Sequence, residues 1–264
     1  MTLFLATTLL ALGLIGGFFS GWLGIGGGII MAPLLLYVPS SIGAGTLDMK
    51  VVAGLTMVQS LFATGSGVLV HRQQKYVSRP LVIWMGAGIT AASLLGALFS
   101  NYLSAHALLG IFSALALTAA VMMFIPHKEA QEEPVAAAVT FNPALAVVCA
   151  VAVGIVGGLV GQSGAFIIIP IMLYLLKIPT RTTIGSSLGI VFLAALSGSI
   201  GKMATGQIDY AMALFCVGGA LVGAQVGGRI STRTPRRHLR QALAVLIAVA
   251  ALRMIWDFLS AMIE

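Results

Sequence analysis

The chain has 264 residues, of which 59% are hydrophobic and only 8% are charged, and its mean hydropathy is +1.07. A soluble domain has roughly 25% charged residues, so this composition excludes a water-soluble globular protein and predicts a polytopic α-helical membrane protein. A β-barrel is not predicted, because barrel strands alternate polar and apolar residues and this chain has continuous apolar runs. The net charge of +7 lies in short loops, where basic residues set membrane topology, and we predict no nucleic-acid partner.

Residues 2–38 form the first apolar block, and its length does not suit an ordinary span. At about 1.5 Å per residue, a single helix of this length would reach roughly 55 Å, whereas the hydrocarbon core is about 30 Å thick. The stretch GWLGIGGGIIMAP, residues 21–33, contains five glycines and a proline, which weaken helices. We therefore predict a hairpin of two short or re-entrant helices that bends at residues 24–28.

Three further apolar segments, at 51–70, 81–100 and 107–125, are long enough to cross a bilayer, which needs about 20 residues. The hydrophilic linker PHKEAQEEPVAAAVTFNP follows and holds three of the seven acidic residues of the chain. After it, residues 143–177 repeat the long apolar block, and GLVGQSGAFIIIP at 158–170 repeats its glycine-rich interruption. The second half therefore also begins with an apolar block whose length does not suit an ordinary span.

The two halves align as an internal repeat. A shift of 137 residues places Gly17, Gly21, Gly24, Gly27 and Pro33 on Gly154, Gly158, Gly161, Gly164 and Pro170. A shift of 131 residues places Lys50, Gly54, Thr56, Ser66 and Gly67 on Arg181, Gly185, Ser187, Ser197 and Gly198. Ten matches in order indicate a duplication. We predict a first transmembrane repeat at 1–125, a linker at 126–142 and a second transmembrane repeat at 143–264.

The basic residues distinguish two topologies. If each long block crosses the membrane once, five basic residues fall on one side and eight on the other, which is a weak bias. If each block is a hairpin, one side keeps Lys50 and Lys202 and the other holds eleven, namely Arg72, Lys75, Arg79, Lys128, Lys177, Arg181, Arg229, Arg233, Arg236, Arg237 and Arg240. The positive-inside rule favours the hairpins. We therefore expect an all-α polytopic membrane protein of two inverted repeats, each a broken or re-entrant helical hairpin plus three transmembrane helices. Both termini are expected outside, and residues 126–142 are expected to be cytoplasmic.

Inverted repeats with broken helices at matching positions are typical of secondary transporters. Backbone amides freed at a break are costly in lipid, and a substrate anion at a helix N-terminus can satisfy them. The candidate substrate-binding residues lie in the two breaks and in the helices that follow them: Gly24, Gly26, Gly27, Gly28, Thr56, Gln59, Ser60, Gly161, Gln162, Ser163, Gly164, Ser186 and Ser187. The other interpretation is that the glycines allow close helix packing. It suits any single glycine, whereas the paired clusters favour a site that faces the other break near the midplane of the bilayer.

Charged residues give weaker indications. Lys50 and Arg181 occupy equivalent repeat positions and are candidates for attracting an anion at the two mouths, although ordinary interfacial side chains that snorkel would show the same pattern. Arg253 and Asp257 are four residues apart on the last helix and are expected to pair. Cys149 and Cys216 lie in apolar runs and are expected to be packing residues. No metal site and no cofactor is predicted.

Two other functions remain open at this point. One is a channel-like anion facilitator without a gating cycle. The other is an intramembrane serine protease, because GQSG at 161–164 matches the G-x-S-G of rhomboid proteases and AHALLG at 105–110 is similar to their histidine segment. The order of histidine and serine is reversed, the spacing is one residue too long, and the repeat partner GIGG has no nucleophile, so the protease is the weaker hypothesis.

The motifs resemble those of the sulfite exporter TauE/SafE family of bacterial membrane proteins. The resemblance rests on GGFFSGWLGIGGGIIMAPLLL and AGLTMVQSLFATGSGVLVHRQQ, and on their counterparts GIVGGLVGQSGAFIIIPIML and IGSSLGIVFLAALSGSIGKMATGQID. It implies a transporter in the bacterial inner membrane whose substrate is a small anion, such as sulfite or an organosulfur anion like sulfoacetate. The expected partners are this substrate and the lipid bilayer, and a homo-oligomer is left open. Members carry more glycine where this chain has GQSGAF, so contacts there are expected to be particular to this protein.

Overall fold

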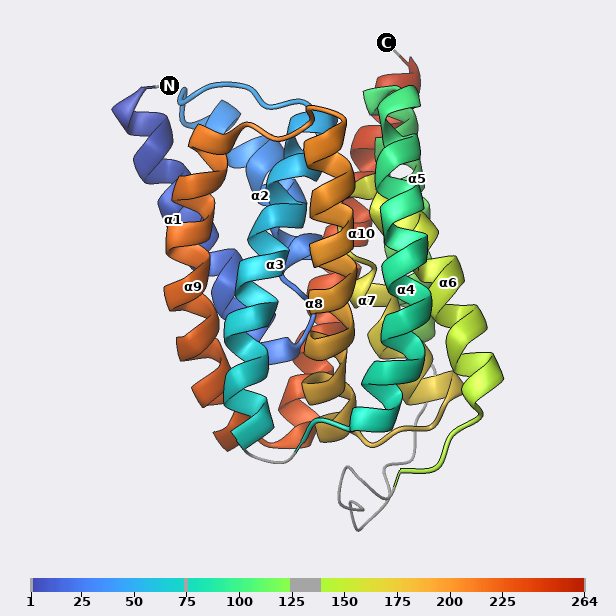
Figure 1. Cartoon of the computed structure of the whole chain (residues 1–264). Helices are drawn as coiled ribbons and strands as arrows, with labels where there is room; N and C mark the ends of the chain where they lie inside the picture. The colour runs from blue at the N-terminus through green and yellow to red at the C-terminus, as the bar shows by residue number, and fades with distance from the viewer. Residues whose placement is uncertain (1, 74–75, 124–138, 264) are drawn as a thin grey trace.

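A computed structural model describes residues 2–73, 76–123 and 139–263, and within these ranges every regular element is a helix. The first half contains α1 (Leu3–Leu23), α2 (Gly28–Ser41), α3 (Met49–Gln73), α4 (Arg79–Phe99), the short η1 (Ser100–Tyr102) and α5 (Ala105–Met123). The second half contains α6 (Pro143–Val160), α7 (Ala165–Pro170), η3 (Ile171–Leu175), α8 (Thr180–Ala204), α9 (Tyr210–Arg233) and α10 (Arg236–Ile263). Figure 1 shows them as one upright bundle.

Side-chain caps fix where several helices begin. Thr2 and Asn142 precede α1 and α6, and their side chains accept hydrogen bonds from Leu5 N and Leu145 N, both at 3.2 Å. Asp209 caps α9 in the same way. Such caps satisfy N–H groups that have no partner inside the helix, and short polar residues between apolar runs therefore mark these boundaries.

Both predicted breaks are confirmed. Helix α1 ends at Leu23 and α2 begins at Gly28, while α6 ends at Val160 and α7 begins at Ala165. The first residue after each long helix, Gly24 or Gly161, has a φ of 75° or 74°. Only glycine adopts this left-handed conformation without a steric penalty, which explains why both breaks start with one. After Pro170 the chain continues as the π-helical turn η3, a short irregular piece in place of a second full helix.

Seven helices of the described chain are long and apolar enough to cross a membrane: α1, α3, α4, α5, α6, α8 and α9. Helix α2 and the segment Phe166–Leu175 are shorter apolar helices. The chain is therefore an all-α polytopic membrane protein, as its composition predicts. The first limb of each hairpin is longer than expected, and the second limb is short.

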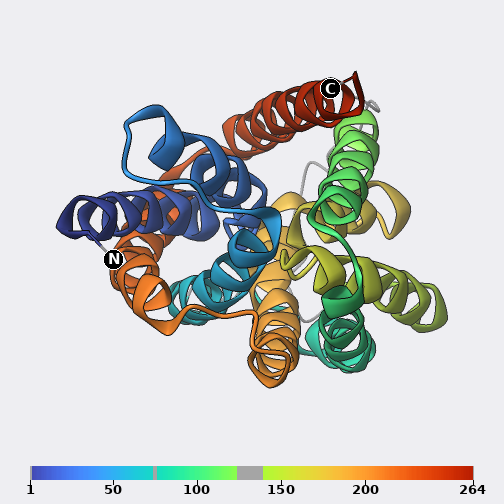
Figure 2. The same ribbon diagram turned by 90° about the horizontal axis from the view of Figure 1, so that it is seen from above.

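The two halves are interleaved. Helix α1 packs along α9, and α6 packs along α4, so the long limb of each hairpin lies against a helix of the other half. Figure 2 shows these two pairs on opposite flanks, with α3 and α8 between them and α10 beside α5. At the α10–α5 contact, Ser113 Oγ donates to the Met254 carbonyl at 3.1 Å. Among the described residues, the largest buried apolar cluster takes side chains from both halves.

Close contacts between the halves occur in pairs related by the repeat offsets. A Cβ at Gly21 would overlap the carbonyl of Ala224, and a Cβ at Gly158 would overlap that of Ser93. The same relation holds for Gly227 against Phe18 and Gly96 against Ile155, and for Gly54 against Gln207 and Gly185 against Tyr76. These glycines let backbones touch where helices cross.

The connections group at two ends of the bundle. Helix α1 begins and α10 ends at the same end, which also holds the loops at 42–48 and 205–209 (Figure 1). The connections at 76–78 and 234–235 lie at the other end. This is the grouping that two hairpins require. If residues 2–38 crossed the bundle once, the loop at 42–48 would lie at the end opposite the N-terminus.

The α1–α9 contact gives a test with adjacent residues. Gly219 faces the backbone of Leu10 and Leu14, whereas Gly218 is exposed and its added Cβ would meet only a side-chain methyl of Leu10 at 3.6 Å. Gly219→Ala should lower the free energy of unfolding by about 1–3 kcal/mol through overpacking. Gly218→Ala should leave it unchanged or raise it by up to about 1 kcal/mol, because alanine is the better helix former. Thermal unfolding of both variants in detergent compares them, and equal destabilisation would contradict this interface.

Candidate functional site

Each break is held by a hydroxyl from the other half of the chain. Thr56 Oγ1 in α3 donates to the carbonyl of Gly161 at 2.9 Å, and Ser187 Oγ in α8 donates to the carbonyl of Gly24 at 2.9 Å. Both hydroxyls and both glycines are buried. The offsets that align the two halves also exchange these two hydrogen bonds, so Thr56 and Ser187 have the same task at opposite breaks.

The same helices approach the breaks closely. A Cβ at Gly161 would overlap the backbone of Ala53, and a Cβ at Gly24 would lie 2.7 Å from the carbonyl of Ile184. Ala53 and Ile184 are again related by the 131-residue offset. Glycine is therefore required at both positions for its conformation and for the space that it leaves.

The second break reaches the first through Gln162. The Gln162 side chain is buried, and its Oε1 occupies the space where a Cβ of Gly28 would stand, at the start of α2. Its Nε2 lies 3.5 Å from Thr56 Oγ1. Ser163, with a φ of 53°, turns its hydroxyl to Met57 Sδ at 3.2 Å. Gly164 is the N-cap of α7, and it contacts Val153 of α6.

Two buried amides with unpartnered atoms, those of Gln59 and Gln162, lie beside the start of α2. Helix α2 begins after Gly27, which has a φ of 75° and provides no side-chain cap. Gln59 of α3 is fully buried, and a Cβ at Gly27 would lie 3.1 Å from its Nε2. Among the described residues, neither Gln59 Nε2 nor Gln59 Oε1 has a hydrogen-bond partner, and the same holds for Ser60 Oγ and Gln162 Oε1. A buried polar atom left unpaired is costly, so such a group of atoms calls for an explanation.

Ser186, Lys50 and Arg181 are not brought to the breaks. Ser186 Oγ accepts a hydrogen bond from Ser78 N at 2.9 Å, where α4 begins. Lys50 Nζ donates to the carbonyl of Asn101 at 3.3 Å, and Arg181 donates to that of Thr232 at 3.1 Å. These two carbonyls are also related by the 131-residue offset.

The profile of the sulfite exporter TauE/SafE family matches residues 9–254. The chain belongs to the TauE/SafE family. Probable membrane transporter protein YunE of Bacillus subtilis is 24% identical, over 94% of this chain and 97% of its own length. A probable membrane transporter protein of Xylella fastidiosa is 28% identical over 91% of each chain, and one of Methanocaldococcus jannaschii is 23% identical over 96% of each. No solved structure matches the chain.

One buried cation of this TauE/SafE protein was missed by the sequence analysis, which treated Lys202 as a loop charge. Lys202 is fully buried near the end of α8. Its Nζ donates to Ser100 Oγ at 2.6 Å, to Gln207 Oε1 at 2.9 Å and to the carbonyl of Leu159 at 3.3 Å. A lysine at the last carbonyls of α6 complements the helix dipole just before the second break. Only its place at the end of an apolar helix could have signalled this.

Arg253 makes a contact that its spacing from Asp257 does not predict. Its guanidinium lies over the Tyr37 ring of α2, 4.6 Å from the ring centre, and so ties α10 to the first hairpin. The side chain of Asp257, the partner expected from spacing, lies outside the described residues. Cys216 is buried, Cys149 is partly buried, and both are free, as expected for packing residues.

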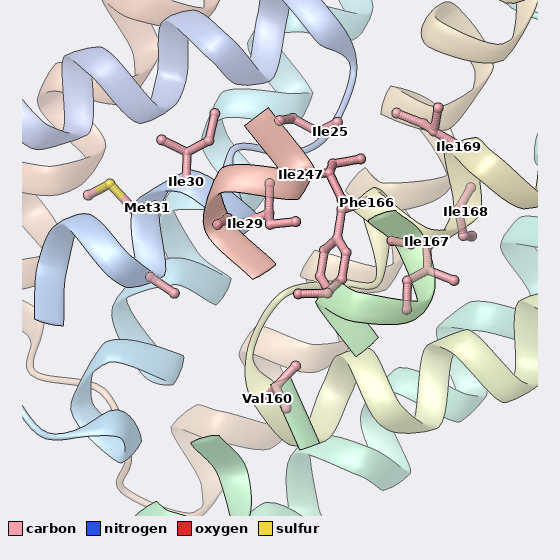
Figure 3. Close-up of a cluster of buried hydrophobic side chains, with 14 of the residues drawn as sticks. Ile25, Ile29, Ile30, Met31, Val160, Phe166, Ile167, Ile168, Ile169 and Ile247 are labelled. Carbon is pink, nitrogen blue, oxygen red and sulfur yellow. The ribbon is translucent and has the colours of Figure 1, made fainter. Parts of the chain in front are cut away.

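Apolar side chains surround the two breaks of the TauE/SafE fold. Figure 3 shows Ile25 and Ile29 from the first break, Val160 and Phe166 from the second, and Ile247 of α10 in one cluster. The Phe166 ring lies 5.7 Å from that of Phe112 of α5, centre to centre. Gln59 and Gln162 are both fully buried, and hydrogen bonds to polar groups are strong in a protein interior.

The cross-half hydrogen bond of Thr56 can be tested against a matched threonine. Thr56→Val keeps the shape of the side chain but leaves the buried Gly161 carbonyl without its donor, which should cost about 1–3 kcal/mol of stability. Thr118 donates only to the carbonyl four residues earlier, at 2.8 Å, and is exposed. Thr118→Val should change stability by less than about 0.5 kcal/mol. Thermal unfolding of both variants in detergent measures the difference, and a Thr56→Val protein as stable as Thr118→Val would argue against the contact.

Proposed function

We propose that this protein is a secondary transporter for a small anion, sulfite or an organosulfur anion such as sulfoacetate, in the bacterial cytoplasmic membrane. Membership of this family and the names of its relatives support a membrane transporter. The sulfur chemistry of the substrate rests on the family name. The transported anion binds between the two glycine-rich breaks, and the bundle gives access to that site from either side in turn.

The observation that carries the proposal is the unpartnered amide of Gln59 beside the start of α2. The first N–H groups of a helix have no partners within it and carry a partial positive charge. Gly27 provides no cap for them, and Gln59 adds a buried amide next to Gly27. An oxyanion bound there accepts hydrogen bonds from both, as anions at helix N-termini do.

The architecture of inverted repeats is part of the same proposal. Residue pairs related by the offsets of 137 and 131 make matching contacts, among them Thr56 with Gly161 and Ser187 with Gly24. Inverted repeats let one sequence pattern build two alternative closures around one midplane site. The termini are outside and residues 126–142 are cytoplasmic in this proposal, as the basic loops require.

A channel-like facilitator is the alternative, and kinetics in proteoliposomes separate it from a carrier. A carrier saturates and shows counterflow, whereas a facilitator does neither. The protease hypothesis loses its main support, because the Ser163 hydroxyl donates to Met57 Sδ and not to an imidazole.

Gln59→Leu tests the site directly. Sulfite, sulfoacetate, taurine, thiosulfate and simple carboxylates are screened for the rise in thermal stability that a ligand of the folded state produces. Losing a donor to a charged ligand costs about 1.5–3 kcal/mol, so Gln59→Leu should weaken binding about 10- to 100-fold. Thr118→Val, far from the breaks, should bind as the unmodified protein does. Unchanged affinity in Gln59→Leu would overturn the proposed site.

Topology is tested with single cysteines in a background without Cys149 and Cys216. Asn101 and Ser104 are exposed at the end where the termini lie, and Arg79 and Arg237 are exposed at the opposite end. We expect cysteines at Asn101 and Ser104 to react with an impermeant thiol reagent in intact cells. Cysteines at Arg79 and Arg237 should react only after the cells are permeabilised, and the reverse pattern would invert the orientation.

A further inference from the structure

We propose that the Gln162 side chain selects anions that carry a hydrogen-bond donor next to their charged group. This inference rests on the proposed function and adds a substrate class to the same site. The class comprises singly protonated oxyanions, and organic anions with a hydroxyl or ammonium group close to the anionic head. Anions without such a donor bind less tightly.

The orientation of the Gln162 amide follows from the proton of Thr56. A threonine hydroxyl has one proton to donate. Thr56 Oγ1 directs it to carbonyl oxygens, with Gly161 O at 2.9 Å and Val52 O at 2.8 Å. Towards Gln162, Thr56 Oγ1 can therefore only accept. The NH2 group of the amide must face Thr56, and Oε1 must face the other way.

In this orientation, Gln162 Oε1 faces the start of α2. Gln162 Oε1 occupies the space beside Gly28, and among the described residues it has no hydrogen-bond partner although the side chain is fully buried. The proposed anion site thus contains an acceptor next to its donors. A ligand that has only acceptors would leave this oxygen unpaired and place like charges together. A ligand with an O–H or N–H beside its anionic oxygens satisfies both kinds of group.

The corresponding positions around the start of α7 lack these groups. The repeat offsets relate Gln162 to Ile25, Gly28 to Ala165 and Gln59 to Ile190. Ile25 and Ile190 are fully buried and apolar. The duplicated fold therefore has one polar end, at α2, and one apolar end, at α7. Selection by a donor group is therefore confined to the α2 end within the part of the chain that the structure describes.

Matched sulfonates test the inference on the intact protein. One pair is 2-hydroxyethanesulfonate and ethanesulfonate, and the other is aminomethanesulfonate and methanesulfonate. Sites built to hydrogen-bond a ligand group reject analogues that lack it. We expect the donor-bearing member to bind at least about tenfold more tightly in at least one pair, as measured by thermal shift and by competition with sulfite. Thr118→Val should keep that ratio.

Gln162→Met then locates the acceptor. Methionine has a similar length and no strong acceptor, so the ratio should fall to about one while the sulfonates without a donor bind at least as well as before. If the unmodified protein binds both members of both pairs equally, or if Gln162→Met keeps the preference, this inference is wrong and the proposed function stands. If neither sulfite nor any of the four sulfonates binds the unmodified protein, the proposed function itself fails.

Discussion

The structure depends on two helix breaks, at residues 24–28 and 161–165, that are buried within a bundle that spans the membrane. In lipid, a free carbonyl or amide has no water to pair with, so a broken helix is stable only if the protein satisfies its ends. Here each break receives a hydroxyl from the opposite half, Thr56 at Gly161 and Ser187 at Gly24. Because each half satisfies the break of the other, the two halves depend on each other and form one structure.

These hydrogen bonds between the two halves account for several of the glycines in the breaks and helices. For Thr56 and Ser187 to reach the breaks, α3 and α8 must approach them at backbone distance, and side chains at Gly161 and Gly24 would prevent that. The glycines along α9, and those of α6 against α4, bring the outer helices equally close. The glycines therefore have a packing role that holds the breaks in place, and the proposed site depends on that packing.

Much of this arrangement can be predicted from sequence, because it depends on local signals. The breaks at residues 24–28 and 161–165 follow from runs of glycine, the helical class follows from composition, and the repeat offsets follow from ordered matches. Which helices touch cannot be derived in this way, because an apolar face does not specify its partner. The interleaving of α1 with α9 therefore had no signal in a single sequence.

The sequence also does not show which way an individual side chain faces. Ser186 and Ser187 are adjacent, yet one step along a helix turns a side chain by about 100°. Only Ser187 faces a break, and Ser186 faces Ser78. Lys202 looked like a loop charge because two of its three acceptors, Ser100 and the Leu159 carbonyl, come from distant segments that only the fold brings together.

Duplication explains why the site can differ between its two ends. The hydroxyls that hold the breaks are needed twice, and both copies keep one, as Thr56 and Ser187. The amides are not kept in both copies, since Gln59 in one half corresponds to Ile190 in the other. If an equivalent polar set were buried at the second break, it would need a ligand of its own to satisfy it. Beside the second break, Phe166 packs against Phe112 within the buried apolar cluster, so the proposed anion site is assigned to the α2 end, where Gln59 and Gln162 lie.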